Sequence, residues 1–407
     1  MAAALVLVVL AAALLLWQRP WHGDASSSEG VVPIPADASV QLTSQLRALT
    51  EAASEDAFVA AAGDAPDAAD FARRTWRSLE AVAVPGASFR YVSGGEVADR
   101  ADGSAIATVE VSWRPAARFG VDPAVTYRST VELRVAPEPD GTFSLINAGR
   151  SGTGNVPLWL VGDVAVDEVD GRAVVRVDGG YESLPIEQMA TTARRAVEDV
   201  VPADGGTLTI ISPRTQTQMS QIVGQDTDAV AQIAAITTGL DGDSTTRDAV
   251  VVLNPAVFAT MDRRAAQIVL THEATHALTP AVGAAAPNWV VEGFADFVAL
   301  HDDTAPLSVS AGQILAQVTA GEAPASLPAD ADFGSTQHGL GAVYESAWMI
   351  FRLLGENHSD ADIVDFYQRV IKGEPVDGAL EATLGLTVGE LTAKWRAYLT
   401  KSASTVS

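Results

Sequence analysis

The hydrophobic pattern of this chain changes its period near residue 84, and that change constrains the fold more than any other feature. Over residues 42–83 apolar side chains recur every three to four positions, which is typical of helices packed on one face. Over residues 87–149 four segments alternate apolar and polar residues and are separated by Gly, Asp and Pro, a pattern typical of antiparallel strands with one solvated face. Helices followed by a run of strands predict an α+β fold.

The rest of the chain predicts a further hairpin and then a second unit. The hairpin is expected over residues 158–179, with an Asp-Gly turn. The second unit is expected from near Leu184, and its predicted elements are a helix at 185–201, a strand at 206–213, a helix at 217–237, a strand at 247–255 and a helix at 262–280, capped by Asp262 and closed by Pro280. From Pro287 to Leu399 the pattern is helical, apart from a loop rich in Gly, Asp and Pro around residues 320–340.

The first residues contain an uninterrupted apolar run from Ala2 to Trp17. These sixteen residues would span roughly 24 Å as a helix. No Lys or Arg precedes the run, and no small-residue cleavage pattern follows it. We therefore expect residues 1–22 to form a membrane anchor with the folded domains outside the cytoplasm; the alternative is a cleaved export signal. Residues 23–40, rich in Ser, Gly, Pro and Asp, are expected to form a flexible stalk.

The charge balance bears on the partners of the chain. Lys and Arg number 26 against 51 Asp and Glu, for a net charge of -25, and no basic block interrupts the acidity. We therefore expect no nucleic-acid partner. The acidity is expected to keep the surface soluble, and the alternative is an attraction for cationic substrates. The chain has no cysteine, so any metal site must be built from His and carboxylate side chains.

His272 and His276 lie four positions apart in the expected helix 262–280, with Glu273 directly after the first. Positions i and i+4 share a helix face, so both imidazoles can bind one ion about 2.0 to 2.1 Å away. Glu273 lies one step around the helix, where it can act on a water at the metal instead of binding the ion. The alternative is two ordinary polar residues on an amphipathic helix. However, the surrounding sequence AAQIVLTHEATHALT is otherwise apolar, and unpartnered imidazoles would be costly there.

A catalytic zinc site needs a third protein ligand and an open position for water. The segment NWVVEGFADFVAL predicts a second helix that begins near Pro287, and Glu292 and Asp296 share one of its faces. Two carboxylates on such an apolar helix need partners, and a metal with its histidines would supply them. The alternative is that both carboxylates are solvated.

HEATH followed by VVEGFADFV resembles the gluzincins, zinc peptidases whose signature is HExxH followed by a helix with Glu-x-x-x-Asp, and among them the bacterial families called peptidase MA-like. By that resemblance His272, His276 and Glu292 are zinc ligands. The resemblance also implies that Glu273 is the general base and that Asp296 accepts a hydrogen bond from a ligand histidine and so orients it.

The same resemblance implies the other parts of a peptidase site. Gluzincins usually stabilise the oxyanion with a Tyr or His from the C-terminal lobe, which here implies Tyr344 or, as the alternative, His338. The strand at 247–255 resembles the sheet edge along which these enzymes bind an extended substrate. The metzincin pattern does not fit, because its Gly and third His would fall at Thr279 and Val282.

Together these features predict an extracytoplasmic zinc peptidase that acts on peptides or proteins. Its peptidase domain is expected over residues 184–400, behind an accessory domain at 41–180 whose element order over 41–155 resembles the NTF2-like cone domains. One alternative is a peptidase-like scaffold that binds cell-envelope peptides or a partner protein with little turnover. The complete set of His272, Glu273, His276 and Glu292 argues against it, since a degenerate site tends to lose Glu273 first. Another is that the N-terminal domain is the working part, as a ligand-binding or assembly module, with a structural zinc.

Overall fold

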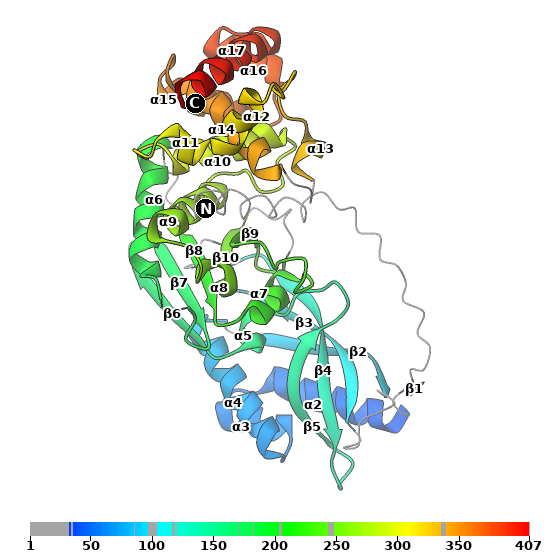
Figure 1. The fold of residues 1–407 in the computed structure, drawn as a ribbon. Coiled ribbons are helices and arrows are strands. Elements are labelled where there is room, and N and C mark those ends of the chain that lie inside the picture. The colour runs from blue at the N-terminus through cyan, green and yellow to red at the C-terminus, as the bar shows by residue number, and fades with distance from the viewer. Residues whose placement is uncertain are drawn as a thin grey trace.

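The computed structural model describes residues 32–33, 36–84, 86–96, 104–115, 119, 121–169, 171–181, 183–202, 206–242, 248–334 and 339–406. The chain is an α+β protein with two five-stranded sheets and a helical C-terminal lobe (Figure 1), which confirms the predicted fold class. Within these ranges no helix has both the length and the apolar character needed to cross a membrane. The anchor predicted for residues 1–22 lies outside the described residues.

Three helices and an antiparallel sheet form the N-terminal unit. The helices are α2 (Ala36–Glu51), α3 (Glu55–Ala62) and α4 (Pro66–Ala81). The strands pair in chain order and are β1 (Val32–Pro33), β2 (Ala87–Glu96), β3 (Ala105–Trp113), β4 (Tyr127–Pro137) and β5 (Phe143–Arg150). Burial alternates along β3 and β4, so the predicted period of two is confirmed. Register shifts after Tyr91 and Arg134 mark bulges, which bend a sheet.

The stalk predicted for residues 23–40 is wrong in its last part. Helix α2 begins at Ala36, and β1 pairs with the end of β2. Ala38, Leu42 and Leu46 lie four positions apart and pack into the core, so the helical period starts earlier than expected. The first part of the predicted stalk, residues 23–31, lies outside the described residues.

The second sheet has the strand order β6-β7-β8-β10-β9. Its strands are β6 (Val164–Val169), β7 (Arg172–Val177), β8 (Leu208–Pro213), β9 (Ala235–Gly239) and β10 (Ala249–Leu253). The inner strands β7, β8 and β10 are parallel, whereas β6 and β9 are antiparallel edge strands. The inner strands are almost wholly buried, as expected of apolar runs covered on both faces. One face packs against α6 (Ile186–Val200) and α9 (Arg263–Leu278), and the other against the N-terminal unit.

The hairpin predicted over residues 158–179 forms as β6 and β7, but it belongs to the second sheet. β7 pairs in parallel with β8, from Arg172 opposite Leu208 to Val177 opposite Pro213. The second sheet therefore begins before Leu184. The domain boundary near residue 180 stays a prediction.

The helix predicted over residues 217–237 is wrong beyond Val223. α7 (Gln216–Val223) ends at Gly224, whose φ of 71° is left-handed, and turns followed by β9 replace the rest of the expected helix. Because β9 pairs on the outside of β10, the strand predicted at the sheet edge, 247–255, is an inner strand. Among the described residues, the edge strand on this side of the sheet is therefore β9.

The C-terminal lobe is helical, as predicted. Its helices are α10 (Asn288–Ala299), α11 (Leu307–Ser310), α12 (Gly312–Thr319), α13 (Asp330–Phe333), α14 (Leu340–Gly355), α15 (Asp360–Ile371), α16 (Val376–Leu384) and α17 (Val388–Val406). Two short helices, α5 (Leu158–Val161) and α8 (Pro255–Phe258), lie earlier in the chain and outside this lobe. A Cβ at Gly293 would lie 2.7 Å from the carbonyl oxygen of Ala347. This glycine therefore permits the close approach of α10 and α14.

Candidate metal centre

Helices α9 and α10 carry the candidate ligands and pack against each other. The side chain of Asp262 accepts a hydrogen bond from the backbone N–H of Ala265 and so caps α9, as the sequence predicts. α10 begins directly after Pro287, and every residue from Asn288 to Val298 is buried. Glu292 and Asp296 therefore face a packed interior and are not solvated helix residues.

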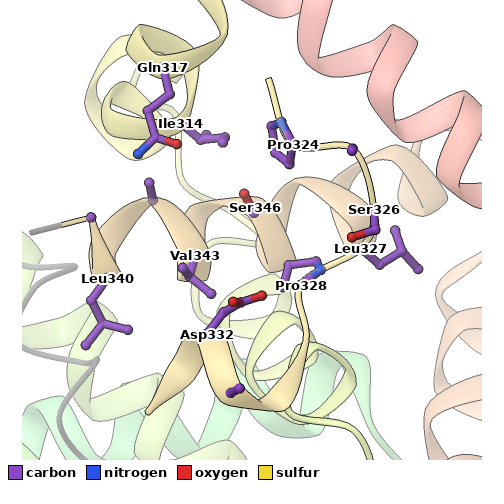
Figure 2. Close-up of a pocket in the computed structure, with 14 residues that line it drawn as sticks. Ile314, Gln317, Pro324, Ser326, Leu327, Pro328, Asp332, Leu340, Val343 and Ser346 are labelled. Atoms are coloured by element: carbon purple, nitrogen blue, oxygen red, sulfur yellow. The ribbon is translucent and has the colours of Figure 1, made fainter. Parts of the chain in front are cut away.

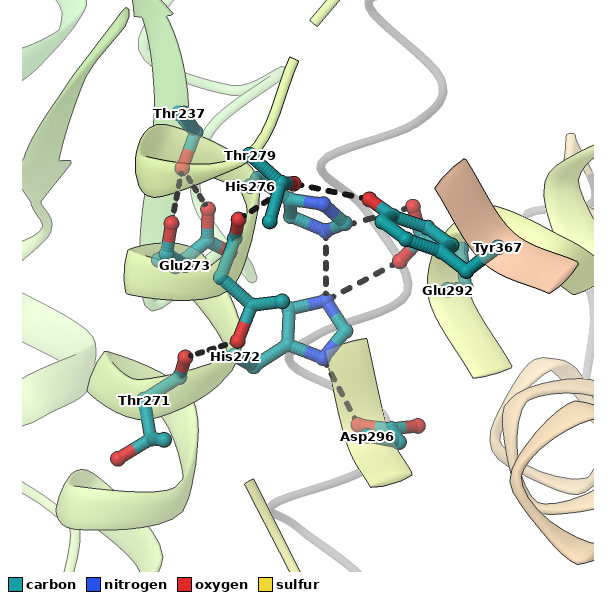
Figure 3. A network of polar contacts seen from close by, with 10 residues as sticks. Thr237, Thr271, His272, Glu273, His276, Thr279, Glu292, Asp296 and Tyr367 are labelled. Carbon is teal, nitrogen blue, oxygen red and sulfur yellow. Dashed lines mark hydrogen bonds and ion pairs between the residues drawn. The ribbon is translucent and has the colours of Figure 1, made fainter. Parts of the chain in front are cut away.

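His272, His276 and Glu292 converge on one point (Figure 3). One ligand atom of each lies within 4.8 Å of the others. Nε2 of His272 lies 3.0 Å from Nε2 of His276 and 3.1 Å from Oε2 of Glu292. Nε2 of His276 lies 3.5 Å from Oε1 of Glu292. The side chain of His276 is 12 % exposed and that of His272 is 1 % exposed, so solvent reaches the group from the side of His276.

The chemistry of these atoms fits a divalent metal ion. Nδ1 of His272 lies 2.8 Å from Oδ1 of Asp296, and donation to that carboxylate places the ring proton on Nδ1. The lone pair of His272 then points from Nε2 toward a second imidazole nitrogen and a carboxylate, which repel it unless a cation or a proton lies among them. Two nitrogens bound to a tetrahedral zinc at about 2.05 Å are about 3.3 Å apart, close to the separation observed here. These three residues can therefore hold a metal ion, with Asp296 orienting one ligand.

Burial and charge shift the pKa values of the ligand group in opposite directions. Burial lowers the pKa of His272, but Asp296 and Glu292 outweigh it and raise the pKa well above its usual value. Burial raises the pKa of Glu292, yet the two histidines lower it to about 2. The site therefore favours positive charge next to an ionised Glu292, which is the electrostatic condition for binding a cation.

Glu273 is buried beside the ligand group without belonging to it. Its carboxylate Oε2 accepts a hydrogen bond of 2.6 Å from the hydroxyl of Thr237 on the edge strand β9. Burial raises the pKa of Glu273, while His272 and His276 oppose the rise. A carboxylate with a raised pKa beside a candidate metal position suits proton transfer near neutral pH.

Tyr344 on α14 faces the same interior. Its side chain is fully buried, and its hydroxyl has no hydrogen-bond partner among the described residues. Burial, followed by the nearby carboxylates of Glu292, Asp296 and Glu273, holds the pKa of Tyr344 well above its usual value, so the hydroxyl stays protonated. An unpaired donor of this kind can serve a ligand. His338, the alternative, lies outside the described residues.

Glu345, next to Tyr344 along α14, fixes this helix against α12. Its carboxylate accepts a hydrogen bond of 2.8 Å from the backbone N–H of Ile314 in the first turn of α12. Burial raises its pKa to about 7. This contact holds the segment that carries Tyr344.

Three further residues around the site, Thr237, Thr279 and Tyr367, were not predicted from the sequence to have a function. The hydroxyls of Thr279 and Tyr367 lie 2.8 Å apart (Figure 3). The ring of Tyr367 stacks on that of Phe294, with the ring centres 3.8 Å apart. Thr237 contacts Glu273, as described above. No sequence motif marks these residues.

A separate cavity of about 390 Å³ lies between α12, α14 and the loop before α13 (Figure 2). Val343, Ser346 and Asp332 are among the residues that line it, and none of the candidate ligands does. On α14, Val343 and Ser346 line the cavity, whereas Tyr344 does not. This cavity is therefore distinct from the candidate metal centre.

No protein family, no curated protein and no solved structure matches this chain.

Proposed function

We propose that this chain is a zinc-dependent peptidase. The observation that carries the proposal is the convergence of His272, His276 and Glu292 around one point, with Glu273 buried beside them. Asp296 and Tyr344 complete the arrangement, the first as the partner of a ligand histidine and the second as an unpaired donor. We propose that it acts outside the cytoplasm, held by the apolar segment from Ala2 to Trp17.

In this proposal His272, His276 and Glu292 hold the zinc ion, and each other residue has one task. Zinc, when bound, would supply a Lewis acid for the scissile carbonyl and for water. Glu273 would accept a proton from the attacking water and pass it to the leaving amine. Tyr344 would donate its hydroxyl proton as a hydrogen bond to the carbonyl oxygen as that oxygen becomes negative. The outer edge of β9, the edge strand of the described sheet, would bind the peptide backbone as an added strand.

The proposal is tested on the full chain by metal analysis and by peptide hydrolysis. Elemental analysis of protein purified without chelator is expected to give one zinc per chain. A quenched-peptide library is expected to be hydrolysed, the activity to disappear on treatment with a chelator, and zinc to restore it. Substoichiometric zinc would contradict the metal site. Full zinc without hydrolysis of any peptide or envelope protein would instead favour the alternative of a peptidase-like scaffold.

Substituting Tyr344 by Phe is expected to lower kcat by about a hundredfold to about a thousandfold, because removing one oxyanion donor has effects of this order. Zinc content is expected to stay at the wild-type value, since Tyr344 is not a ligand. The matched control is Tyr398→Phe, which removes a hydroxyl bonded to Arg352 and Glu356 outside the site. Equal kcat values for the two variants would exclude Tyr344 as the oxyanion donor.

A further inference from the structure

Thr237 joins the edge strand of the second sheet to the helix that carries HExxH. It lies in the middle of β9, opposite Val251 of β10. Its hydroxyl lies 2.6 Å from Oε2 of Glu273 and 3.1 Å from the backbone carbonyl oxygen of the same residue (Figure 3). A hydroxyl has one proton to donate, so the shorter contact with the carboxylate takes most of it.

The carboxylate of Glu273 has few other restraints. In the described part of the chain Thr237 is the one side chain that donates a hydrogen bond to it. Glu273 is only 1 % exposed, so water cannot freely replace a hydrogen bond that its carboxylate loses. The orientation of this carboxylate therefore depends on the hydroxyl of Thr237.

We propose that Thr237 is a positioning residue for the general base. It holds Oε2 of Glu273 and leaves Oε1 to accept the proton of the attacking water. This inference rests on the proposed peptidase function and adds to it a link between two parts of the site. The strand whose backbone binds the peptide also orients, through one side chain, the base that acts on the bond to be cleaved.

The two contributions of this strand are separable. Binding of a peptide along β9 uses backbone N–H and C=O groups, which a change of side chain leaves in place. Orientation of Glu273 uses only the hydroxyl of Thr237. Removing the hydroxyl should therefore lower kcat while KM stays nearly constant.

Three variants of the full chain test the inference. Thr237→Val keeps the shape of the side chain without the donor and is expected to lower kcat by about tenfold to about a hundredfold, with KM within about twofold. Thr237→Ser keeps the donor and is expected to restore most of the activity. Thr209→Val is the matched control, because it removes a buried hydroxyl from β8, two strands away in the same sheet, where it donates to the carbonyl oxygen of Phe119. This control is expected to keep the wild-type kcat.

A double-mutant cycle and the zinc content separate positioning from structure. In a Glu273→Gln background, Thr237→Val is expected to have no further effect on kcat, because the general base that Thr237 positions is already absent. Zinc per chain is expected to stay at the wild-type value in every Thr237 variant. Wild-type kcat in Thr237→Val, equal losses in the Val and Ser variants, or loss of zinc would each overturn the inference.

If the Val variant does not fold, Thr237→Cys, a weak donor of similar size, replaces it. Absence of hydrolysis by the wild type would count against the peptidase function itself, and hydrolysis unaffected by Thr237 would count against this inference alone.

Discussion

Replacing Glu273 by Gln is expected to leave the zinc in place and to lower peptide hydrolysis by about a hundredfold to about ten thousandfold, the usual contribution of general acid–base catalysis. Gln has the same shape and still accepts the hydrogen bond from Thr237 through its carbonyl oxygen. However, it cannot take a proton from water. The measurements are kcat/KM on the best substrate of the peptide library and zinc per chain by elemental analysis.

Glu292→Gln makes the same Glu-to-Gln change on α10 and is the contrasting variant. Glu292→Gln removes the negative charge that lies 3.1 Å from the ring of His272 and 3.5 Å from that of His276. It is expected to lower zinc affinity at least about tenfold, since even groups that only support a ligand contribute that much. Activity should then recover partly at high zinc. If Glu273→Gln lost its zinc while Glu292→Gln kept it, the assignments of base and ligand would be reversed.

Local sequence patterns were sufficient to predict most of the secondary structure near the site. Helix α9 was predictable because Asp262 marks its beginning and an apolar run follows. The histidine spacing of four and the carboxylate spacing of four each place two side chains on one helix face, so the convergence of His272, His276 and Glu292 required only that the two helices pack together. The imidazoles of α9 and the carboxylates of α10 both need polar partners in an apolar setting, and this need favoured the packing of the two helices.

The parts that could not be predicted depend on contacts between segments distant in sequence. Nothing local indicates that Thr237 lies beside Glu273, because residues 224–239 continue a pattern that is compatible with a helix. The left-handed Gly224 ends α7, and only pairing with β10 defines the strand that follows. Local sequence also does not show which strand forms the sheet edge, because strand order is a property of the assembled sheet. The partner of Tyr367 is likewise fixed only by tertiary packing.

A chain that begins at Leu184 is expected not to fold cooperatively, although the sequence predicts a domain starting there. The cut removes β6 and β7 and turns the buried strand β8 into an open edge. It also uncovers the sheet face that packs on the N-terminal unit. The buried apolar residues of that face and its neighbours are Ile211, Met219, Ile222, Val223, Val230, Ile233, Ile236, Leu240, Val250 and Val252.

The magnitude of this loss decides the expected result. Each fully buried aliphatic side chain contributes about 1.5–3 kcal/mol, so exposing this group costs on the order of 10 kcal/mol, against a typical stability of about 5–15 kcal/mol. Polar contacts across the same boundary are lost as well. The hydroxyl of Tyr127 donates to Asp248 at 2.7 Å, and the side-chain amide of Asn155 donates to the carbonyl oxygen of Leu240 at 3.2 Å. The truncated chain should bind a hydrophobic dye and lack near-ultraviolet circular dichroism.

The matched control is a chain that begins at Val32, which keeps every described element and is expected to unfold at the same temperature as the full chain. Comparing both by calorimetry and zinc content distinguishes two roles for the N-terminal unit. If 184–406 unfolds cooperatively and binds zinc, the unit is a separable accessory domain, and the predicted boundary near residue 180 is right. If only the longer chain does so, the unit is part of the scaffold, because its core covers one face of the sheet whose edge strand holds Thr237 against Glu273.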